Sequence, residues 1–163
     1  WGSGQYGRLG TGSNSDAAFP TPVYTGGVLA GKTIKAIDAG YNMACVIASD
    51  DLPYCWGGNG SGELGNNTTT DSNVPVAVVT SGALSGKTVK QLTVGHLHPC
   101  VIASDDQAYC WGNNQAGQLG NNSTTNASVP VAVNAAGEFA GRNVTAISWG
   151  RYNPCAVAVG QAC

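Results

Sequence analysis

The chain has 163 residues, of which 42% are apolar and only 10% are charged, and its formal net charge is −2. This length suffices for the core of one domain, while 24 glycines favour short elements joined by many turns over long helices. Because the seven basic residues form no cluster, the electrostatic attraction that draws proteins to nucleic acids or anionic membranes is missing, and we exclude both as partners.

The first ten residues, W-G-S-G-Q-Y-G-R-L-G, open a pattern that recurs every 55 residues. Four residue types keep this register throughout: Trp1, Trp56 and Trp111; Leu9, Leu64 and Leu119; Pro20, Pro75 and Pro130; Gly40, Gly95 and Gly150. Repetition at such a period is typical of solenoids and propellers. We divide the chain into unit 1 at residues 1–55, a split blade, unit 2 at 56–110, and unit 3 at 111–163, which is short.

Residues 26–33 match the phosphate-loop pattern G-x-x-x-x-G-K-[ST], in which backbone N–H groups cradle phosphate ahead of a helix. The segment that follows, Ile34–Asp38, alternates apolar and polar residues as a strand does. Ser81 and Ala136 replace the first glycine in the other units. We therefore interpret the pattern as a loop between strands, and the G-x-G-x-x-G matches at 2–7 and 60–65 as glycine-rich loops of the same kind.

One cysteine pair occurs in each unit: Cys45 and Cys55, Cys100 and Cys110, Cys155 and Cys163. A hairpin that aligns Cys100 with Cys110 places Val101 opposite Tyr109 and leaves the three-residue loop 104–106. The alternative, a metal site, lacks C-x-x-C spacing and a set of four ligands. We expect three disulfides, and with them an oxidising, extracellular location.

Further strands are predicted at 33–38, 88–94 and 143–148, which alternate in polarity, and at 74–78 and 129–133, the V-P-V-A-V strings. In those strings a proline at the start suits an outer strand, since its missing N–H is tolerated there. The hairpin strands 100–103 and 108–111 are apolar throughout, as expected of strands covered on both faces. Four antiparallel strands per unit predict an all-β fold of three propeller blades, open at both ends and completed by neighbouring copies or a longer chain.

The string C-W-G-x-N-x-x-G-Q-L-G, followed by a polar loop, a proline-led strand and G-x-x-H, resembles the RCC1 (regulator of chromosome condensation) repeat. The best matches are Trp111, Gly112, Asn114, Gly117, Gln118, Leu119, Gly120, Pro130, Gly95 and His98. The resemblance implies a propeller, commonly seven-bladed, whose members serve as exchange factors on small GTPases, binding platforms or protein inhibitors.

The chain departs from this family at three places. Met43 and Asn153 stand where the G-x-x-H histidine is expected, Asp50-Asp51 and Asp105-Asp106 replace the hairpin Asp-Gly, and paired cysteines are added. The matching residues are fold residues and none is an active-site residue, so the resemblance supplies no catalytic role.

Three residue groups have both a chemical and a structural interpretation. His96 and His98 suit a metal pair or an acid–base group, but no third ligand is in view and packing is favoured. The Asp pairs at the hairpin tips suit Ca²⁺, although turn formation explains them as well. The tryptophans after each cysteine suit sugar stacking, although packing between blades is favoured. We predict no catalytic residue, metal or cofactor.

Asn-x-Ser/Thr sequons cluster in one loop of units 2 and 3, and each is a candidate glycosylation site. They begin at Asn59, Asn66, Asn67, Asn121, Asn122, Asn126 and Asn143. The loops 66–71 and 121–126 are polar and turn-rich, so we expect them on the outside.

Two hypotheses for function follow. No run of roughly 18 apolar residues, initiator Met or signal peptide occurs, so we expect a soluble, secreted portion of a precursor. Joining Cys163 of one copy to Trp1 of the next restores the C-W-G string, which predicts a structural protein assembling head-to-tail with copies of itself into an extracellular filament or array. The alternative is a segment of a closed seven-bladed propeller that binds a protein or a glycan.

Overall fold

The computed structural model describes residues 1–134, 141–150 and 153–162. Two short 3-10 helices occur in the described residues, η1 and η2, and both precede the strands in the chain. The elements are η1 (Gln5–Gly7), η2 (Gly27–Leu29), β1 (Ile34–Ala39), β2 (Met43–Ala48), β3 (Pro53–Gly57), β4 (Ser72–Ala77), β5 (Val89–Val94), β6 (Pro99–Ala103), β7 (Ala108–Gly112), β8 (Ala127–Ala132), β9 (Val144–Trp149), β10 (Pro154–Ala158) and β11 (Gln161–Ala162).

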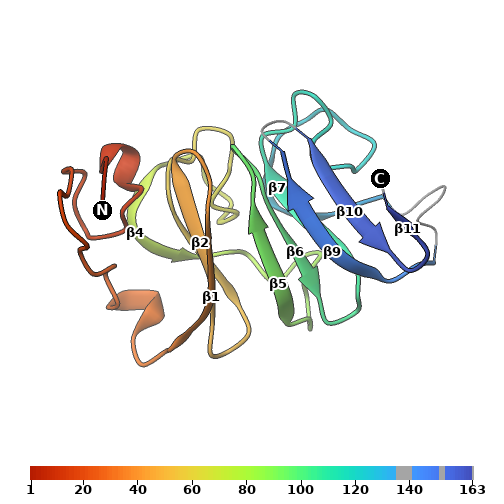
Figure 1. The fold of residues 1–163 in the computed structure, drawn as a ribbon, viewed down its shortest axis with the longest axis horizontal. Helices are drawn as coiled ribbons and strands as arrows, with labels where there is room; N and C mark the ends of the chain where they lie inside the picture. The colour runs from red at the N-terminus through yellow and green to blue at the C-terminus, as the bar shows by residue number, and fades with distance from the viewer. Residues whose placement is uncertain (135–140, 151–152, 163) are drawn as a thin grey trace.

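The strands form three antiparallel sheets that lie side by side in chain order (Figure 1). The first sheet has the order β1-β2-β3-β4, the second has the order β5-β6-β7-β8, and the third consists of β9, β10 and β11. The two termini lie at opposite ends of the row of sheets (Figure 1). The predicted all-β architecture of propeller blades is confirmed. Among the described residues no helix is long and apolar enough to cross a membrane.

The central hairpin of each complete sheet follows its apolar sequence. Every residue of β2, β3, β6 and β7 is buried, as expected of strands covered on both faces. The predicted register is confirmed: Cys100 lies opposite Cys110 and Val101 opposite Tyr109. At the tips, Asp51 and Asp106 adopt the left-handed conformation (φ 61° and 59°) that closes a three-residue loop.

The outer strand of a sheet comes from the repeat unit that follows its hairpin. β4 pairs with β3 through Tyr54–Ala77 and Cys55–Val76, and β8 pairs with β7 in the same way. The expectation that the four strands inside one unit form one blade is therefore corrected, because each complete sheet crosses a unit boundary. Pro75 lies within β4 instead of at its start, which is tolerated because β4 is at the sheet edge.

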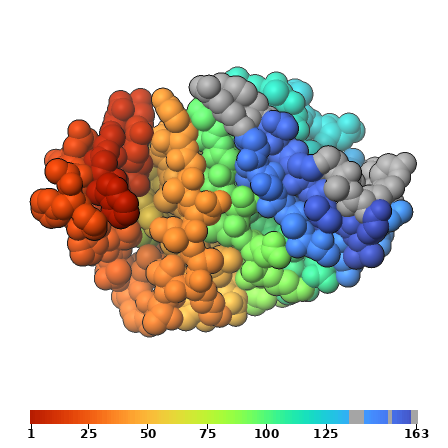
Figure 2. Space-filling model, viewed as in Figure 1, coloured from red at the N-terminus to blue at the C-terminus, as the bar shows by residue number. Residues whose placement is uncertain are grey.

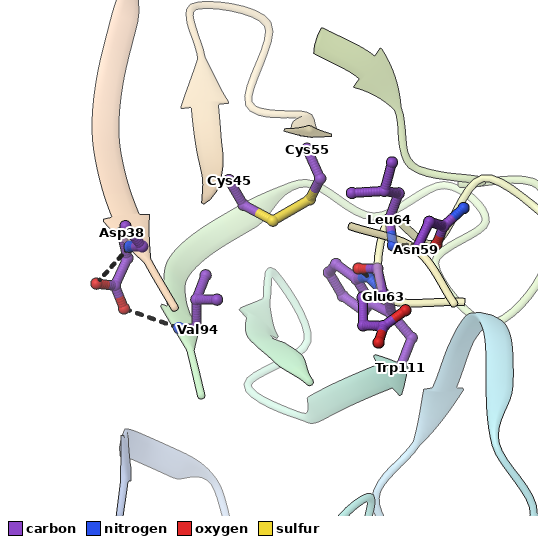
Figure 3. The surroundings of a disulfide bond; sticks show 9 residues. Asp38, Cys45, Cys55, Asn59, Glu63, Leu64, Val94 and Trp111 are labelled. Atoms are coloured by element: carbon purple, nitrogen blue, oxygen red, sulfur yellow. Dashed lines mark hydrogen bonds between the residues drawn. A yellow bond between two sulfur atoms is a disulfide. The ribbon is translucent and has the colours of Figure 1, made fainter. Parts of the chain in front are cut away.

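Two kinds of contact join neighbouring sheets. The carboxylate of Asp38 in the first sheet accepts a hydrogen bond of 2.8 Å from the backbone N–H of Val94 in the second (Figure 3). Buried tryptophans fill the layers between blades, as predicted in preference to a sugar-stacking surface. The indole Nε1 of Trp56 donates to the Arg8 carbonyl at 3.1 Å, and that of Trp111 to the Glu63 carbonyl at 2.8 Å. Strand order and blade packing thus bring residues 55 positions apart into equivalent surroundings.

Two of the predicted disulfides, Cys45–Cys55 and Cys100–Cys110, are present, each joining directly opposite residues of a hairpin. Figure 3 shows the first of them in the core beside the second sheet. Cys163 lies outside the described residues, so its pairing with Cys155 stays a prediction.

Candidate functional site

The connections at one end of the sheets carry the exposed aromatic residues of interest. β1 ends where β2 begins and where β3 ends, because Ala39 pairs with Ala44 and Met43 with Gly57. The same holds for the second sheet. We call this the loop end. There the repeated glycines Gly40 and Gly95 are each followed by an aromatic residue, Tyr41 or His96.

Tyr41 and His96 come from neighbouring sheets and stack on each other. Their ring centroids are 4.4 Å apart with an interplanar angle of 21°, and Tyr41 is 62% exposed. The stack is possible because the glycines before them leave the backbones in contact: a Cβ on Gly40 would overlap the Gly95 carbonyl. The close approach of the ends of β1 and β5 therefore positions the two rings.

Arg8 extends this stack into a cluster. Its guanidinium carbon lies 5.7 Å from the ring centroid of Tyr6 and 5.9 Å from that of Tyr41, within the range of cation–π attraction. Its Nη1 donates to the Tyr41 carbonyl at 3.3 Å, and its Nε donates to the Gln5 carbonyl at 2.9 Å. We call Tyr6, Arg8, Tyr41 and His96 the aromatic patch.

An open hollow of about 420 Å³ adjoins the patch. Its wall is made by the glycines that follow β1, β5 and β9, together with Val94 and three rings. The lining residues are Gly40, Tyr41, Val94, Gly95, His96, Trp149 and Gly150. Aromatic faces and one guanidinium suit stacking and hydrogen bonding to a partner surface.

His98 behaves as a packed residue, the interpretation favoured from the sequence. It is buried, its ring meets Trp149 edge-on at a centroid distance of 4.0 Å, and neither ring nitrogen has a hydrogen-bond partner among the described residues. Burial, and to a smaller extent the nearby His96, lowers the pKa of His98 to about 4. The ring is therefore neutral at pH 7.

The acidic hairpin tips are held by lysines and tyrosines. In the first sheet Tyr54 Oη donates to Asp50 at 2.7 Å, Lys32 Nζ lies 3.7 Å from the same carboxylate, and Lys35 pairs with Asp51 at 2.6 Å. The second sheet repeats this arrangement with Tyr109, Asp105, Lys87, Asp106 and Lys90. No group of three His, Cys, Asp or Glu side chains suited to a metal ion occurs in the described part of the chain.

The contacts at the hairpin tip also shift the pKa values of the side chains there. Burial and the hydrogen bond to Asp50 raise the pKa of Tyr54 to about 12. Burial alone would raise the pKa of Asp50, but the hydrogen bonds from Tyr54 and Leu52 outweigh it and hold this pKa below its ordinary value. Lys32, the lysine of the phosphate-loop pattern, donates to the Val28 carbonyl at 2.7 Å, and strand β1 follows it. These residues stabilise the hairpin tip.

The sequons differ in accessibility. The loops 66–71 and 121–126 lie on the outside as predicted, with most of their residues exposed, and Asn143 is also exposed. Asn59 is fully buried: its Oδ1 accepts from Leu64 N at 2.8 Å, and its Nδ2 donates to the Thr70 carbonyl at 3.0 Å. A glycan needs an accessible amide, so we no longer propose Asn59 as an acceptor.

Sequence reasoning missed the aromatic patch because Tyr41 and His96 are far in the sequence from Tyr6 and Arg8, and the four residues share no motif. Alignment of the three units on their 55-residue period does carry a signal of the patch. Arg8, Glu63 and Gln118 occupy equivalent positions and differ in charge, and Tyr41 and His96 occupy equivalent positions with different rings. Such differences indicate which parts of the repeated surface differ in chemistry from one unit to the next.

The family model described as "Regulator of chromosome condensation (RCC1) repeat" matches residues 1–47, 51–102 and 105–157, and a second model of the same repeat matches residues 89–118. The matched segments cover nearly the whole chain, as expected of a protein built from three repeats.

Several curated relatives have similar sequences. The ultraviolet-B receptor UVR8 of Arabidopsis thaliana is 34% identical over 137 residues, which cover 84% of this chain and 30% of the receptor. The E3 ubiquitin-protein ligase HERC2 of Homo sapiens is 29% identical over 150 residues, 92% of this chain and 3% of the ligase. The human X-linked retinitis pigmentosa GTPase regulator is 32% identical over 133 residues, 82% of this chain and 12% of the regulator. The chain thus spans less than a third of each relative.

Solved structures share the fold. Human WBSCR16 superposes with a TM-score of 0.78 at 24% identity, covering 97% of this chain and 39% of that one. Yeast RCC1 (Prp20), solved bound to Kap60, superposes with a TM-score of 0.74 at 17% identity, covering 97% of this chain and 37% of that one. A further structure of Prp20p is described together with its binding to Gsp1p and histones. At these identities the likeness shows the fold alone.

Proposed function

Because the chain belongs to the regulator of chromosome condensation (RCC1) repeat family, we propose that it is part of a propeller that binds another protein through the aromatic patch. The observation that carries the proposal is the cluster of two exposed tyrosines, Tyr6 and Tyr41, with the half-buried Arg8 against both rings. Tyrosine and arginine are enriched among the residues that dominate binding energy at protein interfaces.

Two further observations support a binding role. The cluster is held in place before any partner arrives, since Arg8 is hydrogen-bonded to two backbone carbonyls and Tyr41 is stacked on His96. Preorganised side chains lose little entropy on binding. The structure of yeast RCC1 with Kap60 is that of a related fold with a protein partner. Our proposal involves no catalytic step and no cofactor.

The test is a comparison of Tyr41→Ala with the unaltered protein in affinity capture followed by titration of the captured partner. We expect at least a tenfold loss of affinity, about 1.4 kcal/mol, with an unchanged melting temperature because Tyr41 is exposed. Tyr24→Ala is the matched control, since Tyr24 is an exposed tyrosine outside the patch. Equal binding by the Tyr41 and Tyr24 variants would refute this role.

A second candidate function is head-to-tail self-association in an extracellular assembly. The two hairpin disulfides favour an oxidising, extracellular location for either function. Exposed sequons outside the patch are compatible with secretion, and a glycan partner remains a lesser alternative to a protein.

A further inference from the structure

Glu63 is a buried carboxylic acid at the junction of the first and second sheets. It is 2% exposed and lies in the loop 58–65, which follows β3. Its backbone carbonyl receives the indole N–H of Trp111 at 2.8 Å, so the residue is held beside the second sheet (Figure 3). The first sheet, in orange, and the second, in green, adjoin in the middle of the molecule (Figure 2). A buried carboxylate is costly unless it is paired, so the surroundings of Glu63 decide what it does to the junction.

The three repeat units place different charges at this point of the blade. Two positions are involved, because a second polar side chain follows eight residues after the first. Unit 1 has a cation and an acid there, unit 2 has two acids, and unit 3 has two amides. In chain order the pairs are Arg8 with Asp16, Glu63 with Asp71, and Gln118 with Asn126. Unit 2 thus carries two like charges where unit 3 is neutral.

The acid of unit 2 has fewer polar partners than the amide that replaces it in unit 3. Glu63 Oε2 accepts a hydrogen bond from Ser61 N at 2.7 Å, and Gln118 Oε1 accepts the equivalent one at 2.8 Å. The nitrogen of Gln118 also donates to Asn113 Oδ1 at 3.1 Å, whereas the equivalent of Asn113 in unit 2 is Gly58, which has no side chain. No Lys or Arg of the described residues forms an ion pair with Glu63.

The groups packed around Glu63 disfavour its ionisation. Burial raises the pKa of Glu63; backbone N–H groups of its own loop oppose this, and the negative charge of Asp71, from the segment before β4, raises the pKa further. On β7 the neighbour is Gly112, which does not ionise. The ring of His98 on β6 lies against Trp149 of the third sheet instead.

This environment makes the docking of the loop depend on pH. Since the pKa of Glu63 is raised above its ordinary value of 4.5, the stability it confers is fully present below pH 4.5 and is lost as the pH rises through the folded-state pKa. The loop is tightly packed: a Cβ on Gly62 would come within 2.6 Å of Ser128 Cα in β8. Ionisation therefore places a buried charge without a cation in a close contact between two sheets.

We propose that Glu63 makes the contact between the loop 58–65 and the second sheet a pH-responsive junction, firm when the carboxyl group is protonated and loosened when it is ionised. The like charge of Asp71 strengthens the response. The junction joins two four-stranded sheets and is separate from the aromatic patch. The proposal is therefore independent of both candidate functions.

The experiment compares amide hydrogen exchange of the unaltered protein and Glu63→Gln by mass spectrometry over a series from pH 4 to pH 8. At pH 8 the segment 59–65 is expected to exchange at least about threefold faster in the unaltered protein, and at pH 4 equally fast in both. Gln is the residue that unit 3 already has at this position, so the variant is expected to fold. Comparison at each pH cancels the effect of His98, which both proteins share. The equivalent segment 114–120 is the control and should not differ between them.

A second measurement follows urea unfolding of the same proteins over the same pH series. Glu63→Gln is expected to raise the unfolding midpoint at pH 8 and to leave it nearly unchanged at pH 4. Asp71→Asn is expected to narrow the pH dependence of the unaltered protein. This change keeps the hydrogen bond that Asp71 accepts from Asn59 N at 2.8 Å, since Asn126 accepts the equivalent bond at 2.9 Å.

Three results would overturn the proposal. The first is equal exchange of the segment 59–65 in the unaltered protein and Glu63→Gln at pH 8. The second is a difference between these two proteins that stays the same from pH 4 to pH 8, which would show a packing effect without ionisation. The third is an undiminished pH dependence in Asp71→Asn.

Discussion

Residues of different types can occupy the same place in neighbouring blades of this protein. The G-x-x-H position holds a buried histidine, His98, in the second sheet and a buried methionine, Met43, in the first. Both fill the same place in the blade, so the position requires volume and not a proton acceptor. An imidazole kept neutral by burial nevertheless makes stability depend on pH.

We predict that His98→Met removes part of the acid sensitivity of the fold. The pKa of His98 is lowered to about 4 in the folded protein from 6.5, so below pH 6.5 the unfolded state binds more protons and the free energy of unfolding falls toward pH 4. The full loss from this group is about 3 kcal/mol, and the effect disappears well above pH 6.5. Urea unfolding of both proteins at a series of pH values measures the difference; parallel curves would contradict the assignment.

Asn114 illustrates a buried polar residue that organises a loop. Its Oδ1 accepts from Leu119 N at 2.8 Å, and its Nδ2 donates to the carbonyls of Ser123 and Thr125 at 3.0 Å each. We expect Asn114→Ala to lower the free energy of unfolding by about 3 kcal/mol, since several buried groups lose their partners. Gln115→Ala, at an exposed neighbour, is expected to change it by no more than about 0.5 kcal/mol. Similar effects of the two substitutions in chemical denaturation would be inconsistent with this role.

At the scale of elements, the hairpin is the most constrained unit of the fold. Its two strands are buried throughout, its tip is closed by an aspartate in the left-handed conformation, and its middle is cross-linked. The tip aspartates pair with lysines that are partly exposed, so these ion pairs contribute little to stability. The disulfide therefore constrains the hairpin more than these ion pairs do.

The double substitution Cys100→Ala/Cys110→Ala is expected to destabilise the protein by about 2 to 3 kcal/mol, the contribution of a small closed loop to the unfolded-state entropy. Denaturant midpoints of both proteins under non-reducing conditions test this value. Mass spectrometry after alkylation without reductant provides an independent count of thiols. Six labelled cysteines would exclude the disulfides and remove the support for the proposed extracellular location.

At the scale of the whole molecule, stability arises between blades as well as within them. Trp56 and Trp111 each join a strand of one sheet to the loop that precedes it in the neighbouring part of the molecule. In repeat proteins the total stability is approximately a sum of unit and interface contributions. Replacing one residue between two blades should then lower the free energy of unfolding of the whole chain.

We expect Trp111→Phe to cost about 2 to 3 kcal/mol, because the smaller ring leaves a cavity and the Glu63 carbonyl loses its donor. Trp56→Phe is expected to have a similar effect, since the same type of site surrounds it. Trp1→Phe is the control, and its exposed ring should leave the melting temperature of the monomer unchanged. An equal loss of stability in all three variants would contradict the prediction that the burial of each ring determines how much it stabilises the fold.

The sequence by itself determined the repeat, the strands and the hairpin register. These depend on local alternation and on the 55-residue spacing of Trp, Leu, Pro and Gly, which are visible without coordinates. Only the tertiary structure decided how strands are grouped: β4 joins the hairpin before it because the chain returns to that edge, a long-range choice that local pattern does not encode. It also decided the site. Arg8, Tyr41 and His96 meet because adjacent inner strands pack with glycines in contact, and Asn59 is buried because its loop folds around its amide.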